Sequence, residues 1–285
     1  MSIVYLNGDY LPMGEARISP MDRGFLFGDG IYEVIPSYQG RMVGFAPHIR
    51  RMADGLSALE IPAPFDTAGW RDIAEQLMQR NGSGNLGIYL HVSRGADTQR
   101  AHAYPVGLQP TVYAFTFEIP PGQIADKRAA TCFKVSTSED LRWKRCHIKS
   151  TALLGNVMHY QFGHARGNSE TILYNARGEI TEAAACNVFV VNKGVVATPP
   201  LDHQKLPGIT RQLVLSILRQ HGDIPVEERE ISLDELRNAD EVWISSSSKE
   251  LAPVIEIDGS PVGAGEVGDV WLAAQQLYSA HKFDY

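Results

Sequence analysis

Asp140-Leu-Arg-Trp-Lys-Arg-Cys-His-Ile-Lys149-Ser-Thr151 is the stretch around which the rest of this chain is organised. It is rich in basic residues and has no regular apolar spacing, but an apolar-periodic run over 152–165 follows at once. Ser150 or Thr151 would be a natural N-cap for that run. The sequence therefore predicts a helix whose N-terminus lies directly after Lys149.

A lysine in that position is a candidate nucleophile. The helix macrodipole disfavours a cation at the N-terminus, and Arg142, Lys144 and Arg145 add positive charge along the chain. Both effects favour the neutral amine, which is the form of lysine that attacks a carbonyl carbon. A surface lysine at a helix entry is the ordinary alternative. The same physical argument does not separate Lys149 from Lys134 or Lys144.

Size and composition indicate an ordinary globular protein. The 285 residues suffice for one large domain or two of average size. Hydrophobic residues make up 44% and charged residues 21% of the chain, which is typical of soluble proteins. The formal net charge of −7 argues against a nucleic-acid-binding protein, because such proteins usually present a basic face.

The three cysteines are Cys132, Cys146 and Cys186, an odd number without a CxxC pair. That pattern favours reduced thiols over a disulfide framework. The first residues carry neither the basic nor the apolar segment of a signal peptide, and no apolar run reaches membrane-spanning length. We therefore expect the protein in the cytoplasm.

Both helices and strands are predicted along the chain. Asn7-Gly8 between apolar flanks indicates a hairpin, and Pro120-Pro121-Gly122 is the best linker candidate. Helices are expected over 47–59, 66–80, 152–165, 206–221 and 267–281. Strands are expected over 31–38, 86–94, 111–118, 129–137, 170–174, 178–181, 186–192, 194–198 and 241–248. Because the strands come in antiparallel clusters with helices interspersed, we expect an α+β chain with domains at 1–119 and 124–285, joined by a linker at 120–123.

Two stretches are suited to binding a phosphate group. Gly208 precedes a predicted helix, so the free N–H groups of Ile209 and Thr210 would point at an anion. The run Ser245–Ser248 follows a predicted strand and offers hydroxyl and N–H groups in a short turn. Each signal is weak alone, because a glycine before a helix is usually a turn and a serine run is usually a solvated loop.

Several charged residues are further candidates. Glu182 stands just before small residues and a strand, where it is either a surface turn residue or a buried acid partner for a cofactor ring nitrogen. Arg100 and His102 would lie on one side of an extended segment and suit carboxylate binding, with solvent exposure as the alternative. Tyr32 is a further hydrogen-bond donor. Helical periodicity places Arg51 opposite an apolar face and therefore in solvent.

An ordered set of motifs resembles the pyridoxal-phosphate enzymes of fold type IV, the class IV aminotransferase family, and among them the D-amino-acid aminotransferases. The resemblance covers residues 1 to about 280. The motifs are Asp22-Arg-Gly-Phe-Leu-Phe-Gly-Asp-Gly-Ile-Tyr-Glu33, His48-Ile-Arg-Arg51, Arg94-Gly with Arg100-Ala-His102, Arg142-Trp-Lys-Arg-Cys-His-Ile-Lys149-Ser, Thr181-Glu182 with Asn187-Val-Phe, Gly208-Ile-Thr-Arg211, and the serines before Glu250-Leu-Ala-Pro-Val.

The resemblance implies a fold and a set of roles. The fold would have a small N-terminal domain over 1–119 and a larger, β-barrel-like domain with surrounding helices over 124–285. The cofactor would be pyridoxal 5′-phosphate, bound to Lys149 as a Schiff base, with Lys149 also moving the substrate proton. Glu182 would pair with the ring nitrogen. The remaining cofactor residues would be Arg51, Ile209, Thr210, Ser246 and Ser247 at the phosphate.

The resemblance also implies a reaction. It would be ping-pong transamination between D-amino acids, such as D-alanine and D-glutamate, and 2-oxo acids. Tyr32, Arg100 and His102 would bind the substrate carboxylate, the last two coming from the other subunit of a homodimer. A further hypothesis is that Arg142 attracts substrate side-chain carboxylates. An (R)-amine or branched-chain-type transaminase, a pyridoxal-phosphate lyase, and a non-catalytic anion-binding protein stay as alternatives.

The chain departs from the family pattern at three places. Ala183-Ala184-Ala185-Cys186 stands where the relatives have a hydroxyl-rich turn after the glutamate. Pro207 before Gly208 and Lys249 after the serines also differ from the expected form. Because lost hydroxyls change the hydrogen bonds near a cofactor, the first departure bears on cofactor retention and substrate range.

Overall fold

The computed structural model describes residues 2–82 and 84–285. The chain forms two compact units: Met1–Pro121 with Ile148–Leu153, and Gly122–His147 with Leu154–Tyr285. The boundary after Pro121 lies inside the segment expected as a linker. Residues 148–153, which carry Lys149, return to the first unit instead of staying with the second.

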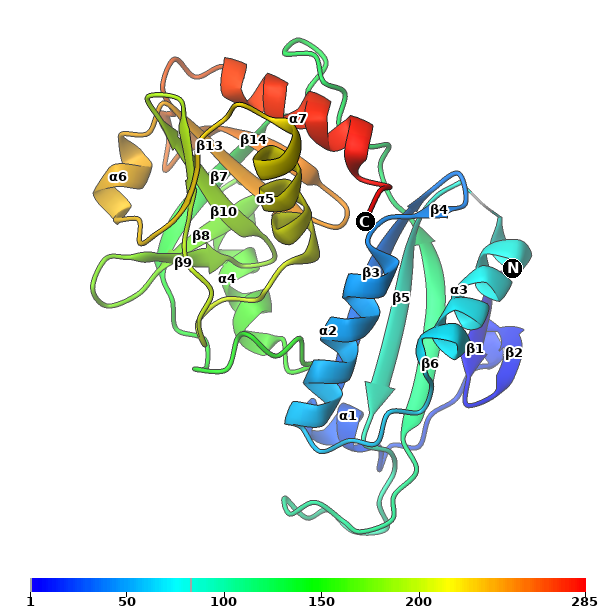
Figure 1. Ribbon diagram of the computed structural model, residues 1–285. Helices are drawn as coiled ribbons and strands as arrows, with labels where there is room; N and C mark the ends of the chain where they lie inside the picture. The colour runs from blue at the N-terminus through cyan, green and yellow to red at the C-terminus, as the bar shows by residue number, and fades with distance from the viewer. Residues whose placement is uncertain (1, 83) are drawn as a thin grey trace. The chain divides into compact units, whose positions relative to one another are not determined.

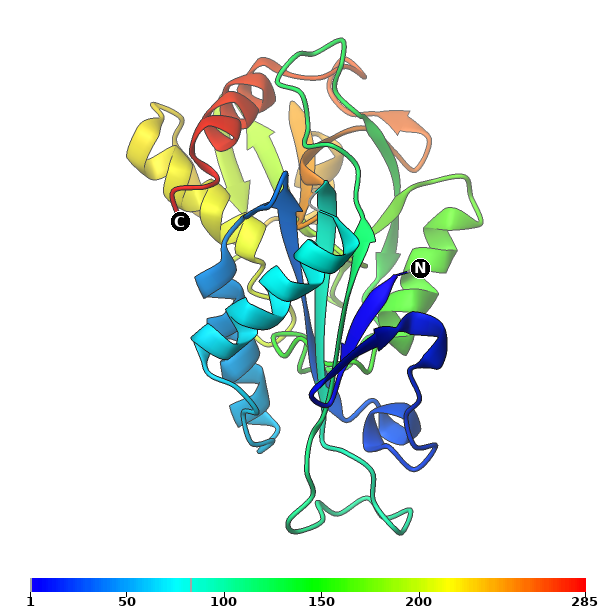
Figure 2. The same cartoon turned by 90° about the vertical axis from the view of Figure 1, so that its right-hand side faces the viewer.

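The first unit is a six-stranded sheet in the order β2-β1-β6-β5-β3-β4, with every pair antiparallel. Helices α2 (Phe45–Ala58) and α3 (Thr67–Asn81) cover one face of it (Figure 1), and Figure 2 shows the same helices running alongside the strands. The strands are β1 (Ile3–Leu6), β2 (Asp9–Pro12), β3 (Gly30–Tyr38), β4 (Arg41–Met42), β5 (Asn85–Ser93) and β6 (Thr111–Glu118).

Local signals in this unit act as predicted. The hairpin turns at Asn7 and Gly8, whose φ angles of 50° and 111° explain the Asn-Gly pair. The Asp66 side chain caps α3 by accepting a hydrogen bond from the Gly69 N–H at 2.8 Å. The helices and the sheet share one core. It includes Ile31, Ile35, Met52, Leu56, Trp70, Leu77, Ile88 and Leu90.

The second unit is a nine-stranded mixed sheet. Its order is β12-β11-β10-β13-β14-β7-β8-β9, and β15 pairs with β14 outside this path. The strands are β7 (Phe133–Glu139), β8 (Glu170–Tyr174), β9 (Ile180–Ala183), β10 (Asn187–Asn192), β11 (Val195–Thr198), β12 (Val226–Glu228), β13 (Glu241–Ser246), β14 (Glu250–Ile257) and β15 (Ser260–Pro261). Strand β7 pairs in parallel with both β14 and β8, so the expectation of purely antiparallel clusters is wrong here.

This sheet must curl. Strands β9 and β10 are far apart in the strand order, yet only Ala184, Ala185 and Cys186 connect them. The Ala183 N–H also donates to the Cys186 carbonyl at 2.7 Å, across that turn. The sheet therefore bends round until these two strands lie side by side, as a half-barrel does. Residues from β9, the start of β10 and the end of β13 thus come to one edge.

The remaining helices are α1 (Arg23–Phe27) in the first unit, and α4 (Leu154–His164), α5 (Ile209–His221), α6 (Leu233–Arg237) and α7 (Asp269–His281) in the second. The predicted start of the helix after Lys149 is wrong. Helix α4 begins at Leu154 and not directly after Thr151, because Ser150 pairs with Ile31 as an isolated antiparallel bridge.

A buried ion pair holds the C-terminal helix region to the second sheet. Glu250 is 1% exposed and its carboxylate pairs with the Lys282 ammonium. Lys282→Met would leave that carboxylate buried without its cation, so the free energy of unfolding should fall by about 3–5 kcal/mol. Lys134→Met, at an exposed pair with Glu256, should cost less than about 1 kcal/mol. Urea unfolding measures both, and equal losses would contradict the assignment.

Candidate active site

Lys149 is held by strand β3. The Tyr32 N–H donates to the Lys149 carbonyl at 3.1 Å, and the next residue, Ser150, forms the bridge to Ile31. The Lys149 ammonium nitrogen lies 4.2 Å from the centroid of the Tyr32 ring. The side chain is thus fixed from both directions, by backbone pairing at its base and by an aromatic ring at its tip.

The structure removes the helix argument for Lys149. Helix α4 begins at Leu154, five residues further along the chain, and the macrodipole acts only within about one turn. The position of Lys149 depends instead on non-local strand pairing. The nearby charge is also smaller than the sequence indicates, since Arg142 is matched by two carboxylates.

Arg51 belongs to a buried triad in the first unit. Its Nε and Nη2 atoms each donate to the Glu33 carboxylate at 2.7 Å. His48 Nδ1 lies 2.7 Å from the same carboxylate, and Glu33 is fully buried. The Arg51 side chain is only 10% exposed. The expectation that helical periodicity leaves Arg51 in solvent is therefore wrong, because a partner on β3 draws it inward.

The charges of this triad follow from its packing. Burial alone would raise the pKa of Glu33, but the Arg51 guanidinium and His48 outweigh it and lower that pKa to about 2. Burial lowers the pKa of His48, although Glu33 opposes the change. Glu33 and Arg51 are thus a charged pair beside a neutral imidazole. The arrangement fixes the Arg51 side chain in one orientation.

Glu182 is the buried carboxylate of the second unit. It is 5% exposed and is the last residue but one of β9, close to the start of β10. Burial raises its pKa, and the Arg142 guanidinium and the Leu206 N–H counteract that rise. Its Oε2 atom accepts from the Leu206 N–H at 2.9 Å and from the Asn187 amide at 3.3 Å. The carboxylate is thereby held firmly at the curled edge of the sheet.

Arg142 is the cation that balances Glu182. Its Nη1 atom lies 2.6 Å from Glu182 Oε1, and its Nη2 atom lies 2.7 Å from Asp140 Oδ2. The side chain is only 2% exposed. Because its donors are occupied by protein carboxylates, this geometry favours a role in holding Glu182 over the attraction of substrate carboxylates.

An anion cradle lies beside Glu182. Helix α5 begins at Ile209, and no side chain among the described residues caps it, so its first N–H groups can donate to a ligand. Gly208 approaches Asn187 so closely that an added Cβ would lie 1.9 Å from the Asn187 Oδ1 atom. Asn187 in turn stands opposite Ser245 in the β10–β13 register. The sequence-predicted Ile209, Thr210, Ser246 and Ser247 are thus gathered at one edge.

The cradle contains an unused hydroxyl group. The Oγ atom of Ser245 is buried and has no hydrogen-bond partner within the described residues. Buried polar groups are normally satisfied, so this hydroxyl indicates a place for a polar ligand. Thr210, 5% exposed, lies in the first turn of α5. The combination of helix N–H groups and serine hydroxyls is suited to a phosphate group.

The predicted carboxylate-binding residues fall into two groups in the single chain. Arg100 and His102 are exposed on the loop between β5 and β6, and both contact the Phe27 ring. Tyr32 contacts Lys149 and stacks on Tyr89 with ring centroids 5.7 Å apart. Contacts within one chain therefore do not bring Arg100 and His102 to Tyr32.

Sequence reasoning assigned no role to Glu33, His48 and Asp140. Glu33 and His48 lie inside the family motifs quoted above. Their contact joins β3 to α2, so no pattern within a single segment of the sequence indicates it. Asp140 is two residues before Arg142 and accepts from its guanidinium and from the Thr181 hydroxyl at 2.8 Å. The spacing of Asp140 and Arg142, with one residue between them, was the available sequence signal for this ion pair.

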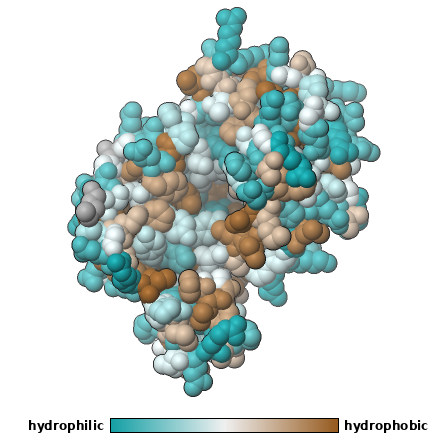
Figure 3. Space-filling model, turned by 180° about the vertical axis from the view of Figure 1, so that it is seen from behind, coloured by the Kyte–Doolittle hydropathy of each residue, from teal (hydrophilic) through white to brown (hydrophobic). Residues whose placement is uncertain are grey.

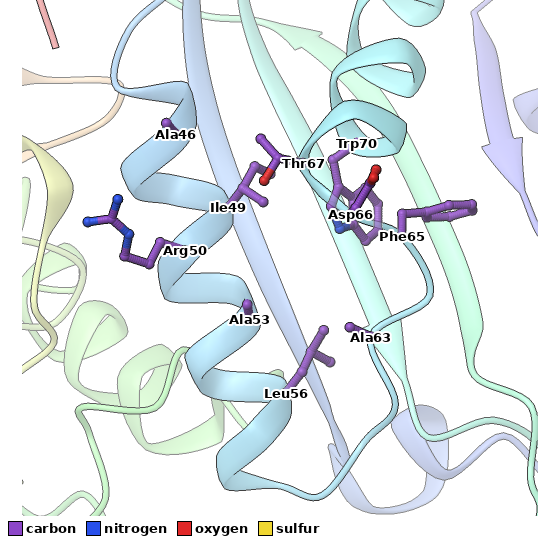
Figure 4. A pocket seen from close by; sticks show the side chains of 10 residues that line it. All are labelled: Ala46, Ile49, Arg50, Ala53, Leu56, Ala63, Phe65, Asp66, Thr67 and Trp70. Carbon is purple, nitrogen blue, oxygen red and sulfur yellow. The ribbon is translucent and has the colours of Figure 1, made fainter.

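A cleft of about 330 Å³ is lined by residues of α2, of α3 and of the segment that joins them, and Figure 4 shows their side chains. Ile49, Ala53 and Leu56 face it from α2, while Arg50 points away from it. None of its lining residues is a predicted cofactor or substrate residue. In the described part of the chain, no cluster of three or more His, Cys, Asp or Glu side chains is placed to hold a metal ion.

No helix among residues 2–82 and 84–285 combines the length and apolar character needed to cross a membrane. All three cysteines are free thiols. Cys132 is exposed, whereas Cys146 and Cys186 are buried. Cys186 occupies the departure from the family turn and lies 3.4 Å from a Glu170 carboxylate oxygen.

Glu33→Gln tests the triad through its pH dependence. The folded pKa of about 2 lies below the ordinary 4.5, so ionised Glu33 adds stability above about pH 4.5 that is lost as the pH falls toward 2. The variant should be less stable than the wild type at neutral pH by about 3 kcal/mol. Urea unfolding should show that difference shrinking below about pH 4.5.

Glu256→Gln is the matched control, since Glu256 forms an exposed pair with Lys134. It should change stability by less than about 1 kcal/mol at every pH. A Glu33→Gln difference that did not vary with pH would contradict the charged-pair assignment.

A family model described as amino-transferase class IV matches residues 30–257. The chain is 35% identical to a D-alanine aminotransferase of Staphylococcus haemolyticus over 285 residues, covering 99% of this chain and 98% of that protein. It is 38% identical to a D-alanine aminotransferase of Bacillus licheniformis over 265 residues, covering 93% and 92% of the two chains.

Solved structures show the same fold. The branched-chain amino acid aminotransferase of Escherichia coli superposes with a TM-score of 0.90 at 24% identity, covering 98% of this chain and 94% of that one. A fold IV transaminase from Curtobacterium pusillum superposes with a TM-score of 0.78 at 25% identity, covering 97% and 93%. The predicted α+β, fold type IV architecture is confirmed, and the chain belongs to the class IV aminotransferase family.

Proposed function

We propose that this chain is a D-amino-acid transaminase that exchanges an amino group between D-amino acids, such as D-alanine and D-glutamate, and 2-oxo acids. The observation that carries the substrate class is near-full-length likeness to proteins named D-alanine aminotransferase at 34–38% identity. The branched-chain neighbours are only 23–24% identical and bear on the fold alone.

The second unit fits pyridoxal 5′-phosphate. A carboxylate has about four acceptor positions, and protein donors from Arg142, Leu206 and Asn187 use three of those on Glu182. One position is thus open for the N–H of a pyridinium ring. The first N–H groups of α5, which no side chain caps, and the Ser245 hydroxyl, which has no partner among the described residues, supply donors for a phosphate.

When bound, this cofactor supplies an aldehyde that takes up the amino group and an electron-poor ring that accepts electrons from the substrate. Lys149 would hold the cofactor through its Nζ atom and would be the base that moves the proton at the substrate Cα. Its backbone pairing to Tyr32 would keep the amine in place for that role. Glu182, held by Arg142, would pair with the ring nitrogen.

The phosphate would be bound by the N–H groups of Ile209 and Thr210 and by the hydroxyls of Ser246 and Ser247. Arg51 would add a guanidinium whose orientation is fixed by Glu33. The phosphate anchors the cofactor, so these residues position it and take no part in proton transfer.

The substrate carboxylate would be bound by Tyr32 together with Arg100 and His102 of a second copy in a homodimer. The separation of these residues into two groups within one chain supports that arrangement. Helix α4 also exposes Leu154, Val157 and Met158 at 73%, 58% and 65%, and apolar patches are visible on the face in Figure 3. Such exposure is typical of surfaces that partners cover. The free thiols support a location in the cytoplasm.

Lys149→Ala tests the assignment of the amine. The variant should stay folded but lose D-alanine to 2-oxoglutarate transamination by at least about 10³-fold, because no other group moves the Cα proton. Lys134→Ala and Lys144→Ala are matched controls, since both residues met the sequence argument equally well. A coupled assay of 2-oxo acid release measures all three. Full activity in Lys149→Ala would contradict the assignment of Lys149, whereas a wild type without activity would leave the non-catalytic anion-binding alternative.

Arg142→Met separates two roles for Arg142. If Arg142 holds Glu182, the variant should lose activity with D-alanine and D-glutamate by the same factor, about 10-fold or more, and should bind cofactor less tightly. If Arg142 attracts substrate side chains, only the activity with D-glutamate should fall, because its KM should rise. The ratio of the two kcat/KM values measures this, and the geometry predicts an unchanged ratio.

A further inference from the structure

The loop between β5 and β6 carries Arg100 and His102, and the buried Arg23 side chain donates hydrogen bonds to its backbone. The loop extends beyond the strands in Figure 1, and apart from a bridge between Ala96 and Asp22 it has no regular pairing in the described chain. Arg23, in the short helix α1, is 3% exposed. Its Nη1 atom donates to the Ala101 carbonyl at 2.5 Å and its Nη2 atom to the His102 carbonyl at 3.1 Å.

Arg23 needs those two carbonyls for electrostatic reasons. Asp29 accepts from Arg23 Nε at 2.8 Å, but it also accepts from Arg94 Nε at 2.8 Å. Two buried guanidinium groups therefore share one carboxylate. Burial alone would raise the pKa of Asp29, and the two arginines outweigh it and lower that pKa. The surplus positive charge is satisfied by carbonyl oxygens, so Arg23 loses acceptors whenever the loop leaves this conformation.

Phe27 supports the side chains of the same loop. It lies four residues after Arg23 on α1, which puts both on one side of the helix. The Arg100 Cζ atom is 5.2 Å from the Phe27 ring centroid, and the His102 ring centroid is 5.4 Å from it. The Arg23 Cζ atom lies 4.9 Å from the same ring. One aromatic ring thus touches both side chains that are predicted to bind the substrate carboxylate.

We propose that Arg23 and Phe27 are positioning residues for the substrate carboxylate. Arg23 fixes the backbone at Ala101 and His102, and Phe27 sets the directions of the Arg100 and His102 side chains. Helix α1 thereby influences the affinity of the protein for the substrate carboxylate without itself contacting the substrate. The inference deepens the proposed function, since it rests on Arg100 and His102 binding the carboxylate.

Phe27→Ala is the central variant, with Phe25→Ala as its matched control. Phe25 lies on the same helix but is 70% exposed. Loss of the shared ring should raise KM for D-alanine and for 2-oxoglutarate about 10-fold, with kcat changed less than about 3-fold. Cofactor absorbance should be unchanged, because Lys149 and Glu182 are not affected. Phe25→Ala should match the wild type within about 2-fold.

Arg23→Lys tests the backbone anchor, because an ammonium cannot reach Asp29 and both carbonyls at once. Hydrogen exchange at the amides of residues 95–109 should speed up about 10-fold or more, while exchange in β5 stays slow. Arg17→Lys is the control, since Arg17 is exposed and donates only to Gly14 and Ala16. Unchanged loop exchange in Arg23→Lys would overturn the anchor role.

Arg100→Ala separates failure of this inference from failure of the proposed function. If Arg100→Ala raises KM but Phe27→Ala does not, Phe27 has no positioning role and the inference is wrong. If Arg100→Ala leaves KM unchanged, the proposed carboxylate site is wrong. The expected result is that both raise KM and that the double variant Phe27→Ala/Arg100→Ala raises KM by less than the product of the two single effects, because Phe27 then acts only through His102.

Discussion

Burying a carboxylate requires matched donors, and this constraint organises the candidate residues within each of the two units taken separately. An unpaired buried charge costs several kcal/mol, so each one must meet a cation or several hydrogen-bond donors. Glu33 meets Arg51 and His48, and Glu182 meets Arg142 and the Leu206 N–H. Because these partners lie far apart in the sequence, satisfying the charges brings distant elements together. The same contacts fix the directions of the side chains proposed to hold the cofactor.

The curled sheet of the second unit gives Glu182 its surroundings. A short turn joins β9 to β10, so the carboxylate, Asn187 and the start of α5 converge. Gly208 is required there, since any side chain would collide with Asn187. The resulting edge combines one negative group with a set of free N–H and hydroxyl donors. A cofactor with a basic ring and a phosphate has the complementary chemistry.

Local signals predicted the parts of the fold that depend on neighbours in sequence. Asn7-Gly8 set the first hairpin and Asp66 set the start of α3, as expected. The family and its architecture were predicted from motifs in order and are confirmed. The start of α4 was predicted wrongly because Ser150 pairs with Ile31, a contact that no local pattern contains. Arg51 was misplaced by periodicity for the same reason, since Glu33 lies on another element.

Lys149 is a candidate for reasons that differ from those the sequence offers. No helix begins beside it, and its neighbours Tyr32 and Ile31 hold it through strand pairing. The most direct measurement is an absorbance titration of the purified protein with D-alanine, L-leucine and (R)-phenylethylamine. If the protein is a D-amino-acid transaminase, D-alanine should convert the absorbance band of the cofactor, and L-leucine and (R)-phenylethylamine should leave that band nearly unchanged. Conversion by L-leucine alone, or a protein without a cofactor band after reconstitution, would contradict it.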